Sequence, residues 1–99
     1  MYEINYSKSA KRYLKKIKNK KLRTAYRDSI EGLKINPYIG EKRTGELRGV
    51  WGYNVMYEKE CYELAYRVYE GSEQLVVIIL AGTQKNFCKE MKRLIKRTE

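Results

Sequence analysis

Two ionisable side chains of opposite charge, Glu63 and Arg67, alternate onto the same face of a predicted β-strand. A carboxylate can act as a general base, and a guanidinium can bind a phosphate oxygen. Lys85 follows the last predicted strand and could bind the same phosphate. The chain contains no histidine, so acid–base chemistry would depend on Glu, Lys, Tyr or Cys. The structural alternative is that Glu63 pairs with Arg67 and that Lys85 is a solvated lysine at the start of a helix.

The strand before Glu63 would contribute to the same face. If the large apolar side chains face the core, Asn54 and Met56 share the face of Glu63 and Arg67; these apolar side chains are Tyr53, Val55, Leu64 and Tyr66. Trp51 and Tyr57 could stack on a nucleotide base. Large aromatic residues dominate small cores, so we expect these two in the core instead.

The elements that position these residues follow the order β-α-α-β-β-β-α. Alternating residues predict a strand over 2–6, and Ser7 can cap a basic amphipathic helix over 8–18. A turn at Asn19 and Lys20 leads to a second helix, which Asn36–Pro37 ends. After a glycine-containing loop, strands are predicted over 53–58, 62–68 and 75–81, the last continuously apolar and therefore central. Spaced apolar residues from Phe87 onward predict a final helix.

Positive charge is concentrated in the first third of the chain. The sequence has 22 Lys and Arg against 12 Asp and Glu, and residues 1–36 contain 11 basic and 3 acidic side chains. Such a surface attracts phosphate backbones by counterion release without reading sequence. Lys11, Lys15 and Lys18 are therefore candidates for contacts with nucleic acid. The alternatives are a solubilising surface and, third, an anionic membrane surface.

Other classes of protein fit the sequence less well. Cys61 and Cys88 belong to no paired Cys or Cys/His arrangement, so we expect neither a metal nor another cofactor. The longest apolar run, residues 75–81, is too short to span a bilayer, and no secretory signal is apparent. We expect one domain over residues 1–99, located in the cytoplasm with reduced thiols.

The order of elements and several short motifs resemble the RelE/ParE toxin superfamily over essentially the whole chain. These motifs are Ser7–Lys8–Ser9–Ala10–Lys11, Asn36–Pro37, Leu47–Arg48–Gly49, Trp51–Gly52–Tyr53 and the strand of residues 62–68. The resemblance implies an α+β fold, in which an N-terminal helical hairpin packs on a small twisted, mostly antiparallel sheet with a C-terminal helix. It also implies that the concave face of the sheet is the working surface.

The resemblance further implies a toxin of a type II toxin–antitoxin system, held in check by a cognate antitoxin protein. RelE-like members cut messenger RNA in the ribosomal A site, whereas ParE-like members inhibit DNA gyrase. We expect a ribosome-dependent mRNA interferase, an endoribonuclease that needs no metal and inhibits translation. The alternatives are a gyrase inhibitor and a non-enzymatic basic protein that binds ribosomes or nucleic acid.

The functional positions of RelE-like nucleases are only partly matched. These enzymes generally carry lysines where Asn54 and Met56 stand, an arginine at Glu63, a basic residue near Gln84 and a tyrosine near Phe87 or Cys88. The candidate catalytic residues are Glu63, Arg67 and Lys85. The candidate RNA-binding residues are Lys11, Lys15, Lys18, Arg48, Asn54 and Gln84.

Overall fold

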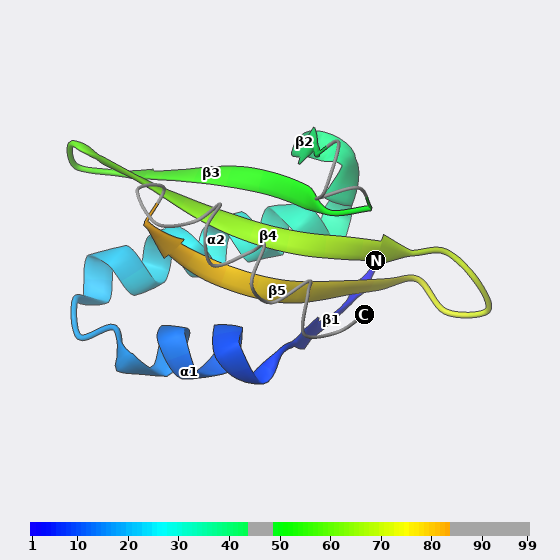
Figure 1. Ribbon diagram of the computed structural model, residues 1–99, viewed down its shortest axis with the longest axis horizontal. Helices are drawn as coiled ribbons and strands as arrows, with labels where there is room; N and C mark the ends of the chain where they lie inside the picture. The colour runs from blue at the N-terminus through cyan, green and yellow to red at the C-terminus, as the bar shows by residue number, and fades with distance from the viewer. Residues whose placement is uncertain (44–48, 84–99) are drawn as a thin grey trace.

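A computed structural model of the chain describes residues 1–43 and 49–83 (Figure 1). The element order is β1, α1, α2, η1, β2, β3, β4 and β5. The predicted C-terminal helix lies outside the described residues. So do three candidate site residues, Arg48, Gln84 and Lys85.

Helix α1 begins after the predicted cap and α2 ends at the predicted signal, but α1 ends two residues earlier than predicted and Lys20 lies in α2 rather than in the turn. Helix α1 spans Lys8–Lys16, and the hydroxyl of its N-cap, Ser7, accepts a hydrogen bond from the backbone N–H of Ala10 at 3.1 Å. Helix α2 spans Lys20–Ile35 and is capped by the side chain of Asn19. It ends before Pro37, the first residue of the short 3-10 helix η1, Pro37–Ile39. Side-chain capping satisfies backbone N–H groups that a helix start leaves unpaired, which explains these boundaries.

The sheet has five strands in the spatial order β1-β5-β4-β3-β2. Their bounds are Glu3–Tyr6, Glu41–Lys42, Trp51–Tyr57, Glu60–Tyr69 and Leu75–Thr83 for β1 to β5. Strand β1 pairs with β5 in parallel, and the other pairs are antiparallel. The apolar strand β5 thus lies inside the sheet, as predicted. The two-residue strand β2 falls in a segment that we expected to be loop.

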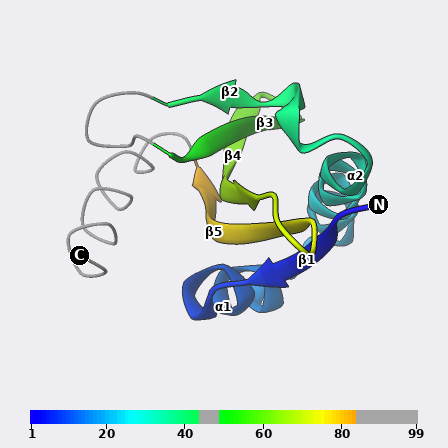
Figure 2. The ribbon, with the colours of Figure 1, turned by 90° about the vertical axis from the view of Figure 1, so that its right-hand side faces the viewer.

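The core fills the space between one face of the sheet and the two helices, which lie together on the same side of the curved sheet (Figure 2). From α2 it takes Leu22, Tyr26, Ile30 and Leu33, and from the strands Val55, Leu64, Tyr66, Val76 and Ile78. Tyr53 packs against this core, whereas Asn54 and Met56 are exposed. The predicted alternation of β3 and β4 is therefore confirmed for these residues.

Close backbone packing holds η1 and β2 against the sheet. The buried hydroxyl of Tyr66 donates a hydrogen bond to the carbonyl of Pro37 at 2.6 Å. A Cβ atom on Gly40 would lie 2.6 Å from the carbonyl oxygen of Gly52, closer than real Cβ contacts come. Only glycine therefore fits at position 40.

A carboxylate ties two segments to the end of β4. Glu70 accepts hydrogen bonds from the hydroxyl of Tyr38 in η1 at 2.6 Å and from that of Tyr2, before β1, at 2.7 Å. These hydrogen bonds favour the ionised carboxylate and lower the pKa of Glu70.

Candidate functional site

The face of the sheet opposite the helices brings together residues from three strands. The register places Asn54 of β3 beside Glu63 of β4, and Glu63 beside Gly82 of β5. Gly52 and Ala65 form the next pair in this direction. Among residues 1–43 and 49–83, no helix covers this face (Figure 2). Asn54 and Glu63, two of the predicted site residues, are therefore direct neighbours on it.

Glu63 is buried and already has a charged partner. Its side chain is 2% exposed, and its Oε1 forms an ion pair with Nη2 of Arg43. In the described part of the chain, Glu63 is the one buried charged residue. The structural alternative that paired Glu63 with Arg67 was wrong about the partner, because Arg43 approaches from β2. A general base needs access to the proton it removes, and this carboxylate is occupied.

Arg43 is a site residue that the sequence analysis did not single out. It directly follows β2, and its backbone N–H donates to the carbonyl of Val50 at 2.9 Å. A Cβ atom on Gly52 would lie between 2.6 and 3.0 Å from three guanidinium atoms of Arg43. The guanidinium therefore lies against the bare backbone of Gly52. Twenty residues separate Arg43 from Glu63, so no local pattern indicated the pair.

Arg67 is half-buried and points toward the start of β3. A Cβ atom on Gly49 would lie 3.1 Å from its Nη1. Gly49 has a φ of 86°, a left-handed conformation that favours glycine. The guanidinium groups of Arg67 and Arg43 thus lie at the two ends of the short segment from Gly49 to Gly52.

The two aromatic candidates for base stacking belong to the helix-facing side. Trp51 and Tyr57 both pack against the core. Trp51 makes an edge-to-face contact with Tyr38 at a centroid distance of 5.3 Å. The amide of Asn19 donates to the Tyr57 hydroxyl at 3.0 Å. The expectation that both rings serve the core is confirmed.

The tyrosines whose pKa is shifted are all weaker acids than a free tyrosine. Burial raises the pKa of Tyr26, and it raises that of Tyr66 to about 12. Hydrogen bonds to Glu70 raise the pKa of Tyr2 and of Tyr38, and one to Glu60 raises that of Tyr62 to about 12. These five hydroxyls stay protonated at neutral pH, so they can donate hydrogen bonds but are not activated to accept protons.

The basic residues of the helical hairpin lie on a different part of the surface. Lys11, Lys15 and Lys18 are all exposed, on or just after α1. Between residues 8 and 27 the sequence has cations but no acidic side chain. In the described residues, ion pairs involve only Lys34 and Arg43 among the cations, so the cations of residues 8–27 have no ion-pair partner there.

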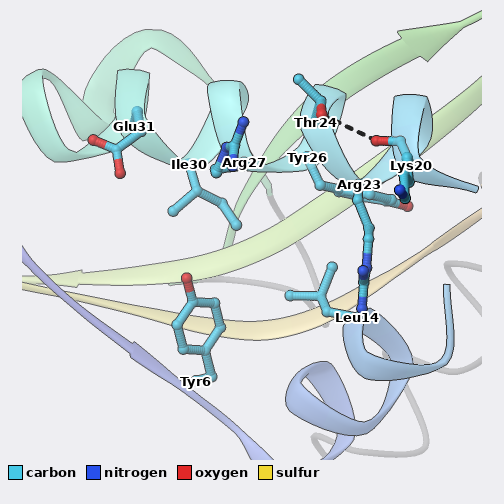
Figure 3. A pocket seen from close by; sticks show the side chains of 9 residues that line it. All are labelled: Tyr6, Leu14, Lys20, Arg23, Thr24, Tyr26, Arg27, Ile30 and Glu31. Carbon is cyan, nitrogen blue, oxygen red and sulfur yellow. Dashed lines mark hydrogen bonds between the residues drawn. The ribbon is translucent and has the colours of Figure 1, made fainter. Parts of the chain in front are cut away.

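An open pocket of about 530 Å³ lies within this basic region (Figure 3). Tyr6 of β1, Leu14 of α1 and residues of α2 line it, with Lys20, Arg23 and Arg27 contributing positive charge. The pocket is on the helical side of the molecule and includes none of the residues around Glu63.

The described residues contain neither a candidate metal site nor a candidate membrane-spanning helix. No group of three or more Cys, Asp or Glu side chains there could hold a metal ion. Nor does that part of the chain contain a helix long and apolar enough to cross a membrane.

Comparison with solved structures defines the class of fold. The chain is similar to a protein in the toxin–antitoxin complex RelBE2 from Mycobacterium tuberculosis, with 23% identity and a TM-score of 0.64 over 84% of this chain and 98% of the other. It is also similar to a mutant of the E. coli toxin RelE in the free state, with 16% identity and a TM-score of 0.68 over 93% and 96% of the two chains. The molecule therefore has the α+β fold of RelE-type toxins.

A family model identifies the protein more closely. The model described as ParE-like toxin of type II bacterial toxin–antitoxin system matches residues 4–92. The chain belongs to this family, as the resemblance to the RelE/ParE superfamily predicted. No curated protein matches the sequence.

Proposed function

We propose that this toxin inhibits translation by cutting messenger RNA on the ribosome, and that a cognate antitoxin protein binds and silences it. The observation that carries the proposal is the group of polar and charged side chains on the face of the sheet opposite α1 and α2, called the open face below because no helix among the described residues covers it. Arg43 and Arg67 supply cations, Glu63 a carboxylate and Asn54 an exposed amide. Guanidinium groups suit phosphate recognition because their N–H groups match phosphate oxygens.

The reaction would use a nucleophile that the RNA itself carries. The 2′-oxygen attacks the adjacent phosphorus, the bond to the 5′-oxygen breaks, and a cyclic phosphate forms. The proton of the 2′-hydroxyl must leave and the 5′-oxygen must gain one, while charge on the phosphate increases. The position of Arg67, on the open face beside Gly49, supports a role for it in stabilising that charge.

The basic hairpin supports a polyanionic target such as ribosomal RNA. Affinity that depends on counterion release falls steeply with salt, and each phosphate contact that is lost lowers the slope by roughly 0.7 to 0.9. We expect Lys11→Glu with Lys15→Glu to flatten the salt dependence of ribosome binding. The matched control reverses two exposed or partly exposed lysines outside α1, Lys34 at the end of α2 and Lys59 in the turn between β3 and β4, as Lys34→Glu with Lys59→Glu. Equal effects of the two double variants would contradict a footprint centred on α1.

Cleavage is tested by primer extension on messenger RNA bound to purified ribosomes. Arg67→Ala should lower the cleavage rate by about 10²-fold while circular dichroism stays unchanged, since one preorganised donor is typically worth that much. Intact messenger RNA with the folded wild-type toxin would contradict the proposed reaction. Full activity of Arg67→Ala would remove Arg67 from it.

Gyrase inhibition is the second candidate. The observation that favours it is that the carboxylate of Glu63, the candidate base, is already paired with Arg43. A supercoiling assay with purified gyrase separates the two functions. Inhibition of supercoiling without cleavage of messenger RNA would favour the second.

A further inference from the structure

The guanidinium of Arg43 is held in place from three directions. The backbone N–H of Arg43 is hydrogen-bonded to Val50, which fixes the start of the side chain. Glu63 binds Nη2, and the missing side chain of Gly52 provides the space in which the guanidinium lies. A long side chain that could adopt many rotamers is thereby restricted to one region of the open face.

Stability alone does not explain why this ion pair is buried. Burying a carboxylate removes its hydration, and replacing a buried ion pair by apolar residues of similar size is often neutral or stabilising. Glu63 is nevertheless 2% exposed, in the centre of the open face rather than in the core. The Arg43 side chain remains 25% exposed, so it is less enclosed than its partner. The buried carboxylate therefore has the geometry of a support for a more accessible cation.

We propose that Arg43 is the phosphate-binding residue of this face and that Glu63 is its positioning residue rather than a general base. The assignment rests on the proposed reaction with RNA. The ligand is a phosphodiester lying along the segment from Gly49 to Gly52, between the guanidinium groups of Arg43 and Arg67. Gly49 is exposed and has no side chain, so a phosphate can approach its backbone closely, whereas at Gly52 it would meet the guanidinium of Arg43.

The sharpest test moves Arg43 without changing any charge. In Gly52→Ala the new methyl group would lie within 3.0 Å of the guanidinium, which must shift while the pair with Glu63 can still form. The backbone of Gly52 does not have a positive φ, so alanine fits there. Displacement by about an ångström can lower a rate by about 10²-fold. The control is Gly71→Ala, whose methyl group would meet no atom within 4 Å.

Glu63→Gln distinguishes a positioning role from a general base. The amide oxygen of glutamine still accepts a hydrogen bond from Arg43, so we expect cleavage within about tenfold of wild type, with a pH–rate profile of unchanged shape. Arg43→Lys retains the charge but not the fork of donors, and it should lose about 10²-fold in kcat. Full activity of Gly52→Ala would overturn the assignment of Arg43. A folded but inactive Glu63→Gln would overturn the positioning role and make Glu63 the base.

A binding measurement separates this inference from the proposed reaction. The probe is a short DNA oligonucleotide, which has the phosphates but lacks the 2′-hydroxyl, titrated into the folded toxin and followed by NMR. The amide signals of positions 52 and 54 should shift in the wild type and in Gly71→Ala, and much less in Gly52→Ala and Arg43→Lys. If this pattern is found but messenger RNA stays intact, the reaction is wrong and the phosphate site stands. If the shifts are equal in all four proteins, the phosphate site is wrong.

Discussion

Removing Arg43 should destabilise the protein much more than removing its buried partner Glu63. Arg43→Met leaves a carboxylate that is 2% exposed without its partner, and an uncompensated buried charge costs about 3–5 kcal/mol. For a domain of this size each kcal/mol lowers Tm by about 4–8 °C, so we expect a decrease of at least about 12 °C. Glu63→Met is milder, about 1–2 kcal/mol, because Arg43 is a quarter exposed and can turn toward water. The double substitution should return close to wild type.

Urea unfolding of the isolated toxin at neutral pH, followed by circular dichroism, measures the four free energies of this cycle. Its coupling term isolates the pair from the separate effects of each methionine. Lys42→Met is the matched control, since it removes the same charge from an exposed neighbour and should stay within about 0.5 kcal/mol of wild type. An Arg43→Met variant as stable as Lys42→Met would refute the reasoning, because Glu63 would then not depend on its partner.

Three further substitutions test contacts outside the site. Tyr66→Phe removes the buried hydroxyl that donates to Pro37, and urea unfolding should show a loss of about 1–2 kcal/mol. The pKa of Glu70 is lowered, so its contribution to stability is complete at neutral pH and is lost as the pH falls through that pKa. The Tm of Glu70→Gln should therefore lie below that of the wild type at neutral pH, and the difference should shrink in acid. A difference that stays constant would contradict this. Gly40→Ala forces a methyl group against a backbone carbonyl, so calorimetry should show a much lower Tm than for Gly71→Ala.

Local signals explain how well the elements could be predicted. Ser7 and Asn36–Pro37 mark helix boundaries through capping and through the missing N–H of proline, and both act on adjacent residues. The alternation around Val55 likewise depends only on neighbours in the strand. These elements, and the exposed positions of Asn54 and Lys11, follow from patterns a few residues long.

Long-range pairing explains what the sequence did not indicate. Strand β2 has only two residues, and its pairing with Trp51 and Gly52 depends on a turn of the chain rather than on a period. The partner of Glu63 follows from that pairing, which brings Arg43 over Gly52. The prediction that Glu63 is a base therefore used only the face of the strand on which it lies, and it could not take the ion pair with Arg43 into account. The roles of Arg67, Lys85 and the RNA-binding residues stay predictions.

The parallel pairing of β1 with β5 governs when this protein can become toxic during its synthesis. Glu3 pairs with Leu75, so the first strand has no partner until most of the chain has been made. At a rate of synthesis of about 5–20 residues per second, β5 is made on the order of 3 to 15 seconds after β1. Pairing between strands so distant in sequence is a slow step of folding. Messages truncated before β5 should yield fragments that cannot complete the sheet. Premature stop codons between Glu63 and β5 would therefore abolish toxicity, even though both residues of the Arg43–Glu63 pair have already been translated.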